Sequence, residues 1–514
     1  MIDPETTDVE MTAAERKPGG FDPALRRLAI VVVLGAIMTI LDTTITNVAV
    51  NTLGRAFGTS LSTIQWVLTG YTLALSMSIP LSGWAIARFG AKTMWITSLL
   101  LFIGGSVLCG LAWDVTSLVG FRLLQGFGAG MIMPIGQTML ARAAGPDRMG
   151  RVMSVVSIPA MLAPVLGPVV GGLILDHLSW RWMFYVNVPF CLIAVVAAIR
   201  LLPADAIRDR GSRLDVLGLL LLSPGLGALV YGTSEVGQGV ALTDARVLAG
   251  VLGGVALVAA YLVHAARKGR AALVDTRLLR NRNFAAVNGV LFAYVGALFA
   301  LMALVPLYFQ VVVGDTPLKS GLMMAPLGLG AMVTMPFSGR LTDRISPRLL
   351  VFCSLPVVLL GMLGLTQVDA DTGRVPLIAL MFAIGLGHGM MMPAAMGSSY
   401  RTLDRSEISS ATTTVNVGMR VASSFGVAAL LVLLQRNVEQ ELPGVRGSVA
   451  AVAEAGPPAR VASLLSAAFT HTFWWALVIA AVALVPAALM QGRARPAPGR
   501  RPAEEAAGTV HSGH

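Results

Sequence analysis

The sequence predicts an all-α integral membrane protein with fourteen membrane-spanning helices, and three observations support this. Of the 514 residues, 55% are hydrophobic and 13% are charged, whereas an ordinary soluble protein has roughly 25% charged residues. Apolar windows of about 20 residues, the length that crosses a hydrocarbon core of about 30 Å, recur along the chain. The charged residues lie in short clusters between these windows. This composition excludes a water-soluble globule.

Fourteen apolar windows define the predicted spans. Backbone groups in lipid must form their hydrogen bonds within the segment, so each window is expected to be a helix. Their approximate bounds are 28–50, 62–84, 93–112, 116–140, 151–175, 182–202, 213–232, 246–266, 284–312, 320–339, 349–366, 376–398, 409–434 and 472–491.

The positive charges predict the orientation of the spans. Of the 38 Lys and Arg residues, 28 fall in the tails and loops on the N-terminal side, eight in the opposite loops and two inside spans. The positive-inside rule therefore predicts that both termini are cytoplasmic. We interpret the net charge of +11 as charge facing anionic lipid, and we expect no nucleic-acid partner. The first 25 residues do not have the form of a cleavable signal peptide.

An internal repeat divides the chain. Three motifs recur in the same order, 256 to 259 residues later: Gly128, Gly130, Met131, Met133 and Pro134 as Gly387, Gly389, Met390, Met392 and Pro393; Ser82, Gly83 and Arg88 as Ser338, Gly339 and Arg344; Asp147 and Arg148 as Asp404 and Arg405. The matched spans have the same orientation, so the halves are parallel repeats related by an axis along the membrane normal. We expect two six-helix halves plus two inserted helices.

The repeat predicts both the domain organisation and a class of function. The expected segments are a cytoplasmic tail (1–25), the first half (26–203), the insertion with its linkers (204–281), the second half (282–491) and a disordered cytoplasmic tail (492–514). Paired halves with a site between them are the architecture of alternating access, so we expect transport. We expect neither an enzyme nor a metal or cofactor, because the six histidines are scattered and form no catalytic cluster.

Away from the ends of the predicted spans, whose bounds are approximate, four charged or histidine residues remain: Asp42, Arg122, His388 and Arg420. A charge at mid-depth costs about 2.5–3.5 kcal/mol on the insertion scale, so each needs a partner or water. Asp42 and Arg122 both lie about 9 Å from the outer face, and we expect them to pair. A carboxylate that alternates between a guanidinium and isolation would bind and release protons. The alternative reading is a permanent structural ion pair.

The predicted substrate-binding residues lie on several spans. Arg420 and Asn416 belong to a polar stripe that is typical of a cavity wall, although a structural role for Arg420 is an equal alternative. His388 is either a relay or ligand contact or a packing histidine. The full set of expected ligand contacts is Gln125, Met133, Tyr294, Tyr308, His388, Asn416 and Arg420.

Four motifs carry a resemblance to a known family. They are LDTTITNVA at 41–49, RLLQGFG at 122–128, APVLGPVVGG at 163–172 and WRWMFYVNVP at 180–189. In this order they resemble the major facilitator superfamily and, within it, the fourteen-span drug/proton antiporters. The two extra spans and PLYFQ at 306–310 are similar to the same branch.

The resemblance implies a function and a set of roles. It implies a monomeric exporter in the bacterial cytoplasmic membrane that exchanges protons for amphipathic, often cationic, drugs and draws its energy from the proton gradient. Asp42 and Arg122 are then the proton-coupling residues. The fifth span becomes a gate, although a tight seam between helices is the alternative; its residues are Pro164, Gly167, Pro168, Gly171 and Gly172. A dedicated lipid or secondary-metabolite exporter or flippase, and a sensor without transport, are the rival functions.

The loop after the second span departs from the family pattern. It reads GWAIARFGAK at 83–92, so Ala87 replaces the usual aspartate beside Arg88. That aspartate latches the two halves in the family, so we expect a weaker or rebuilt latch here. The repeat copy retains the acid as Asp343, next to Arg344. We expect all three residues, Arg88, Asp343 and Arg344, to control the conformational change.

Overall fold

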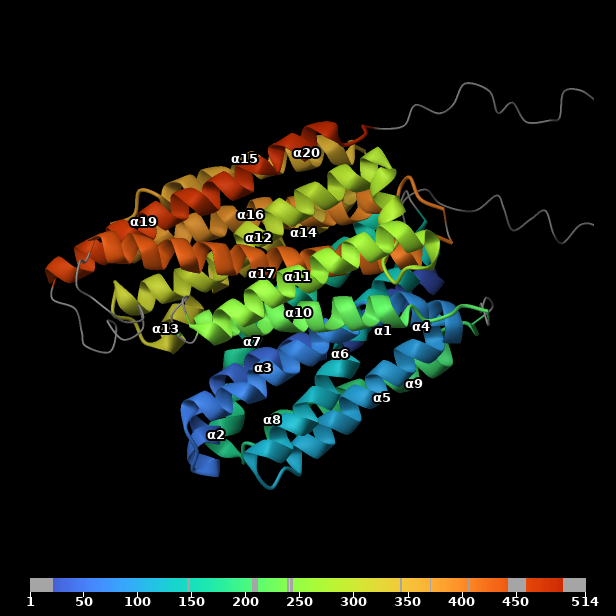
Figure 1. Cartoon of the computed structure of the whole chain (residues 1–514), viewed down its shortest axis with the longest axis horizontal. Coiled ribbons are helices and arrows are strands. Elements are labelled where there is room, and N and C mark those ends of the chain that lie inside the picture. Colours follow the sequence, from blue (N-terminus) through green and yellow to red (C-terminus); the bar gives the residue numbers. More distant parts are fainter. Residues whose placement is uncertain are drawn as a thin grey trace, which may run out of the picture.

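A computed structural model describes residues 22–145, 148–205, 211–237, 240, 244–342, 344–369, 371–404, 406–441 and 459–492. Every regular element in these residues is a helix (Figure 1). The first half contains α1 (Pro23–Val48), α2 (Val50–Phe57), α3 (Leu61–Ser78), α4 (Leu81–Phe89), α5 (Ala91–Gly110), α6 (Val115–Ala144), α7 (Met149–His177), α8 (Trp182–Tyr185) and α9 (Asn187–Leu201). The later elements are α10 (Val216–Gly237), α11 (Ala245–Lys268), η2 (Gly269–Ala271), η3 (Thr276–Arg280), α12 (Arg282–Val311), α13 (Pro317–Leu322), α14 (Ala325–Leu341), α15 (Pro347–Leu365), α16 (Arg374–Ser399), α17 (Ile408–Glu441), α19 (Ala459–Val482) and α20 (Leu484–Leu489).

Twelve helical segments in the described residues are long and apolar enough to cross a membrane. They coincide with twelve of the fourteen predicted spans, so the all-helical membrane fold is confirmed. The predicted spans 62–84 and 151–175 coincide with α3 together with α4, and with α7. α3 is 18 residues long and carries several hydroxyl side chains. The count of fourteen and the cytoplasmic position of the termini stay predictions.

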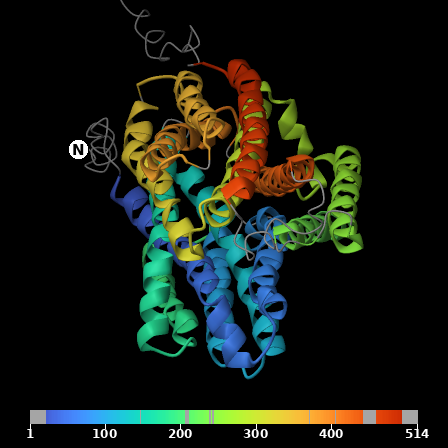
Figure 2. The same cartoon turned by 90° about the vertical axis from the view of Figure 1, so that its left-hand side faces the viewer.

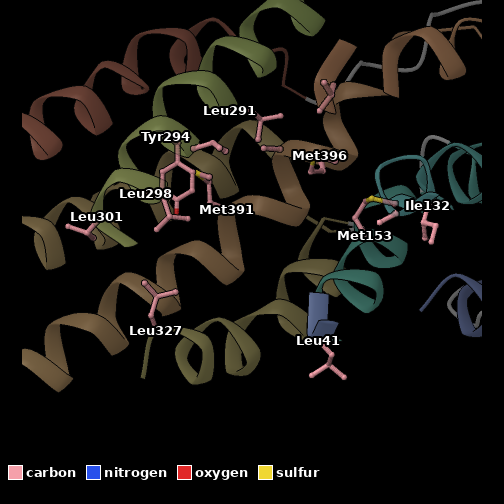
Figure 3. Packing of buried hydrophobic residues seen from close by; sticks show 14 of the residues in the cluster. Leu41, Ile132, Met153, Leu291, Tyr294, Leu298, Leu301, Leu327, Met391 and Met396 are labelled. Carbon is pink, nitrogen blue, oxygen red and sulfur yellow. The ribbon is translucent and has the colours of Figure 1, made fainter. Parts of the chain in front are cut away.

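The helices form two bundles. Figure 2 shows the helices of the first half (blue to teal) below those of the second half (yellow to red). In the first bundle α6 packs on α3 and α5, and α1 packs on α7 and α9. In the second, α16 packs on α14 and α15, and α12 packs on α17 and α19. Figure 3 shows Tyr294 and Leu298 of α12 beside Met391 of α16 in the buried core.

Glycine contacts show that the two bundles repeat one packing pattern. A Cβ on Gly130 of α6 would meet the carbonyl oxygen of Leu75 in α3. A Cβ on Gly389 of α16 would meet the carbonyl oxygen of Ala331 in α14. Leu75 and Ala331 are separated by the same 256 residues that separate the repeated serine motifs. The duplication predicted from sequence is therefore a duplication of helix contacts, in which small residues let backbones approach closely.

Within the described residues, three hydrogen bonds join α17 of the second bundle to the first. They run along one face of α17, beginning at the end of the molecule where α4 lies (Figure 1). The bonds are Ser409 Oγ to the Gly83 carbonyl oxygen (3.3 Å), Thr413 Oγ1 to Ser82 Oγ (3.3 Å) and Asn416 Nδ2 to Gln137 Oε1 (2.7 Å). The same end contains close contacts of α7 with α14 and α16. The two bundles are thus closed against each other at this end.

Figure 2 shows the inserted helices (green) at the right-hand edge of the molecule, and in Figure 1 they run across the middle of the view. α10 is attached to α3 by two hydrogen bonds: Ser223 Oγ donates to the Met77 carbonyl oxygen (2.7 Å), and the hydroxyls of Thr69 and Ser234 lie 2.9 Å apart. α10 also packs on α17, where Val417 joins an apolar cluster with α10 side chains. α11 packs on the outside of α10. The insertion therefore contacts both bundles at one lateral seam.

Candidate functional site

A buried ion pair lies inside the first bundle. Asp42 on α1 and Arg122 on α6 are 1% and 0% exposed, and Arg122 Nη1 lies 2.5 Å from Asp42 Oδ2. α6 begins two turns before Arg122, at a capping box in which the Asp114 carboxylate accepts the backbone N–H of Ser117 (2.7 Å). This backbone bond, with a second from the Ser117 side chain, holds the pKa of Asp114 below its usual value. The cap fixes where α6 starts, and hence the depth of Arg122.

Two amide side chains complete the coordination of the Asp42 carboxylate. Gln125 Nε2 and Asn187 Nδ2 donate to Asp42 Oδ1 at 2.9 and 2.7 Å. Both amides also donate to Ser106 Oγ, at 2.6 and 3.2 Å. Four helices therefore meet at this carboxylate: α1, α5, α6 and α9. Charge-assisted hydrogen bonds of this kind are about twice as strong as neutral ones.

The Arg122 guanidinium is held on its other sides as well. Its Nη1 also donates to Gln125 Oε1 (2.7 Å), and its Nε donates to the carbonyl oxygen of Val67 (3.2 Å). The guanidinium carbon lies 4.1 Å from the ring centroid of Tyr71. Among the described residues, Arg122 Nη2 is buried and has no hydrogen-bond acceptor. Protonation of Asp42 would therefore leave the Arg122 guanidinium with a buried and uncompensated charge, which is costly in a low dielectric.

Sequence reasoning placed Asp42, Arg122 and Gln125 but did not include Asn187, Ser106 or Tyr71 among the site residues. The criterion for a proton-coupling residue was a charged side chain inside a span. These three side chains are uncharged at neutral pH and do not meet it. A search for amides inside apolar windows would have found Asn187, which is fully buried at the start of α9. The predicted contact between Asp42 and Arg122 is present, and their role in proton coupling stays a prediction.

Tyr294 and His388 form a second buried pair, in the other bundle. The Tyr294 hydroxyl lies 2.8 Å from His388 Nδ1, and the two rings stack with centroids 5.7 Å apart. Tyr308 does not join them. It lies nearly four turns further along α12, where its hydroxyl donates to the Asp369 carbonyl oxygen (2.8 Å) among aromatic rings that include Phe469. The predicted ligand contacts Tyr294 and His388 thus lie together, whereas Tyr308 lies at a separate position along α12.

The remaining predicted substrate contacts lie on the faces that the bundles turn toward each other. Asn416 of α17 is bonded to Gln137 of α6, and Met133, one turn before Gln137 on α6, is half-buried. Arg420 follows Asn416 by one helical turn and is also half-buried. Tyr71 interacts electrostatically with both Arg122 and Arg420. One aromatic residue therefore lies between the buried ion pair and α17.

The predicted gate helix, α7, packs closely on α1. A Cβ on Gly167 would overlap Thr44, and one on Gly171 would lie 3.4 Å from the Ile45 carbonyl oxygen. Gly172 has open space around its Cβ position. Pro164 and Pro168 belong to α7, but their side chains lie outside the described part of the chain. Since α7 also packs on α14 and α16, it connects the helix of Asp42 to the second bundle.

The predicted latch residues lie at the end of the molecule where the bundles meet. Arg88 is half-buried near the end of α4, Arg344 is exposed just after α14, and Asp343 lies outside the described residues. Asp205, which follows α9, accepts the backbone N–H groups of Lys92 (2.9 Å) and Thr93 (3.0 Å). Its carboxylate thereby caps the start of α5. The segment expected as a loop is mostly helical, because Ala87 and Arg88 belong to α4 and only Gly90 separates α4 from α5. An acid from a distant part of the chain therefore lies just after the helix that contains Ala87.

Comparisons with known proteins give a family match and two similar proteins. The family model for the Major Facilitator Superfamily matches residues 32–427. A multidrug resistance protein B homolog from Mycobacterium tuberculosis is 38% identical over 81% of this chain and 77% of its own length. A putative multidrug resistance protein MdtD from Klebsiella pneumoniae is 30% identical over 80% of this chain and 87% of its own length.

A solved structure has the same fold. A double tryptophan mutant of XylE superposes with a TM-score of 0.62 at 14% identity, covering 91% of this chain and 96% of XylE. The paired bundles, the repeated glycine contacts and the buried ion pair are thus found in a chain that matches a transporter family over most of its length. This chain belongs to the Major Facilitator Superfamily of membrane transporters.

Proposed function

We propose that this protein is a proton-coupled antiporter that exports small amphipathic compounds across the bacterial cytoplasmic membrane by alternating access. The observation that carries the proposal is the Asp42 carboxylate, which is buried within the first membrane-spanning helix and paired with Arg122 at 2.5 Å. An intramembrane acid that is held by a breakable partner is suited to bind and release protons. The multidrug resistance names of two bacterial relatives support small-molecule export and this membrane.

In the proposed cycle, a proton from outside neutralises Asp42. The carboxylate then loses its attraction to Arg122, and the donors on Gln125 and Asn187 lose a charged acceptor. Inward movement of one proton supplies about 1.4 kcal/mol per pH unit and about 2.3 kcal/mol per 100 mV of membrane potential. This energy is enough to drive useful accumulation of a substrate on the outer side.

A packed route leads from the acid to the interface between the bundles. Thr44 lies two residues after Asp42 on α1 and is in close contact with Gly167 of α7. α7 in turn contacts α14 and α16 of the second bundle. A shift of α1 that follows protonation would move α7, because tightly packed helices transmit displacement and do not absorb it.

The test uses purified protein in liposomes with a trapped pH dye and an imposed proton gradient. The substrate panel contains a lipophilic cation, the class that the sequence predicts, together with neutral and anionic amphiphiles. We expect substrate-triggered proton movement in the wild type, its loss in Asp42→Asn and its retention in Asp371→Asn, which changes an exposed acid. Equal proton movement in Asp42→Asn would refute the role of Asp42.

The same measurement separates the rival functions. If no compound in the panel moves protons, the proposal of a broad-range antiporter fails. Addition of lipid extracts or a secondary-metabolite extract to the same liposomes then tests a dedicated exporter or flippase. A protein that binds compounds without any flux would be a sensor.

A further inference from the structure

The hydrogen bonds between α17 and the first bundle stop at a defined residue. They occur at Ser409, Thr413 and Asn416, which share one face of the helix. The next residue on this face is Arg420, about 18 Å along the helix from its first residue. Arg420 is half-buried, whereas Asn416 is 9% exposed. Arg420 therefore lies one turn beyond the last described hydrogen bond between α17 and the first bundle, at about the middle of the predicted span.

The Arg420 guanidinium has no bonded partner in the described part of the chain. The ion pairs found there involve other residues, and the one hydrogen bond at Arg420 is accepted by its backbone carbonyl oxygen, from Ser423. Arg122 is the contrasting case, because its guanidinium contacts a carboxylate, an amide, a carbonyl group and an aromatic ring. An unpaired arginine at mid-depth is expensive and is characteristic of a substrate pathway.

The nearby charges leave the positive charge of Arg420 uncompensated. Asp42 is buried in the first bundle and is already paired with Arg122. The electrostatic neighbour of Arg420 among the described titratable groups is Tyr71, a phenol that carries no charge at neutral pH. Two half-buried methionines lie on the helices that meet at the Asn416–Gln137 bond, Met419 on α17 and Met133 on α6, and methionine adapts to varied apolar shapes. A cation on helices that also carry adaptable apolar side chains suits an amphiphile with a negative head.

We propose that Arg420 binds an anionic group, such as a carboxylate or sulfonate, on the compounds that this protein transports. The inference rests on the proposed export function and narrows its substrate class to anionic or zwitterionic amphiphiles. A guanidinium donates two parallel hydrogen bonds to a carboxylate, so the anion would supply the partner that this guanidinium lacks among the described residues. The bound pair carries no net charge, which lowers the cost of moving it between the two membrane faces.

The test measures binding of three probes that share a ring and chain: 1-pyrenebutyrate, 1-pyrenebutanol and 1-pyrenebutylamine. Energy transfer from protein tryptophans to pyrene reports binding in liposomes without any proton gradient. We expect the wild type to bind the carboxylate at least tenfold more tightly than the amine. Arg420→Gln should lose at least tenfold in carboxylate affinity and little in alcohol affinity. Arg420→Lys should retain most of the charge preference.

Arg436→Gln is the matched control, because it removes an exposed arginine from the same helix. It should bind all three probes as the wild type does. Arg420→Met is the second charge-removing variant if Arg420→Gln does not reach the membrane. Since the Arg420 guanidinium has no bonded partner among the described residues, either variant should melt no lower than the wild type. A large drop in Tm would instead indicate a structural role and overturn the proposal.

The outcomes separate this inference from the export function. A wild type that prefers the amine, or an Arg420→Gln variant that keeps full carboxylate affinity, overturns the role of Arg420 even if substrate-triggered proton movement is present. Binding of the carboxylate through Arg420 without any proton movement would retain the anion site and refute proton-coupled export.

Discussion

Gly397 of α16 and Gly150 of α7 meet backbone to backbone across the two bundles: a Cβ on Gly397 would lie 2.8 Å from the Gly150 nitrogen. This is closer than a real Cβ comes to backbone, and neither partner has a flexible side chain that could move aside. The two bundles can therefore close at this end only while both positions lack side chains. In the proposed alternating-access cycle, this contact would be a steric requirement for one of the two conformations.

Gly397→Ala should accordingly weaken closure at this end. Overpacking of a tight contact costs roughly 1–3 kcal/mol, which is enough to shift a conformational equilibrium by tenfold or more. Spin labels at the exposed positions Phe89 and Arg344, one on each bundle, should show a larger population at long distance. Gly418→Ala, where the added methyl group meets nothing within 4 Å, should leave the distribution unchanged. Identical distributions for both variants would contradict the steric interpretation.

Asn187→Leu should reduce transport. The substitution removes one of the amide donors to the Asp42 carboxylate and leaves Gln125 as the other. A hydrogen bond to a charged group contributes about 1.5–3 kcal/mol, so we expect the initial rate of substrate-triggered proton movement to fall at least tenfold. Asn288→Leu is the control, because the Asn288 amide donates to Phe284 within its own helix. An unchanged rate in Asn187→Leu would show that this amide does not assist the acid.

Arg122→Lys should reduce proton-coupled transport nearly as much as a substitution that removes the charge. An ammonium cannot reproduce the contacts that the guanidinium makes through Nη1 and Nε while its plane covers Tyr71. We expect a loss of more than tenfold in proton-coupled transport, measured beside Arg55→Lys at an exposed position. Wild-type activity in Arg122→Lys would mean that charge alone is sufficient at this site.

The inserted helices should contribute a pH-dependent stability. Asp215, just before α10, accepts hydrogen bonds from Lys268 Nζ (2.7 Å) and His264 Nε2 (2.9 Å) near the end of α11. Burial alone would raise the pKa of Asp215, but the bonds from Lys268, His264 and the Gly218 backbone hold it below its usual value. A depressed folded pKa stabilises the fold above the unfolded value of about 3.9, and this stabilisation is lost as the pH falls through the lower folded value.

Asp215→Asn should therefore lower the free energy of unfolding at pH 7 by roughly 1.5–3 kcal/mol, the contribution of a buried charge-assisted hydrogen bond. It should also remove part of the decline in Tm that the wild type shows below about pH 4. Thermal melting in detergent over a pH series measures both effects. Asp244→Asn keeps a good cap at the start of α11 and should follow the wild-type profile. Parallel profiles for Asp215→Asn and the wild type would exclude Asp215 as the source.

Much of the fold was predictable because hydropathy and positive charge act on long windows. Twelve spans, the duplicated halves and the inserted pair all follow from features of 20 residues or more. The contact between Asp42 and Arg122 was predictable for a different reason. Two opposite charges at one depth in lipid each require a partner, and each charge is the nearest available partner of the other.

The other contacts of the site depend on how each helix is rotated about its axis and on neutral polar side chains. Hydropathy and charge, averaged over long windows, contain no information on either. Asn187 was missed because an amide in a span carries a smaller cost than a charge and gives a weaker signal. Tyr308 was grouped with His388 although nearly four helical turns separate it from Tyr294, the residue that stacks on that histidine. The carboxylate that caps α5 comes from Asp205, a residue more than 110 positions away along the chain, which no local motif could indicate.

The attachment of the inserted pair determines how it travels during the cycle. α10 is hydrogen-bonded to α3, and its described contact with α17 is made through the apolar cluster around Val417. Apolar contacts are non-directional, so in the proposed alternating-access cycle α17 can move against α10 without breaking a hydrogen bond of that described contact. The inserted pair would then move with the first bundle and widen the lipid-facing perimeter of that bundle. With this attachment, the proposed conformational change needs the same moving parts as in a transporter built from two six-helix halves alone.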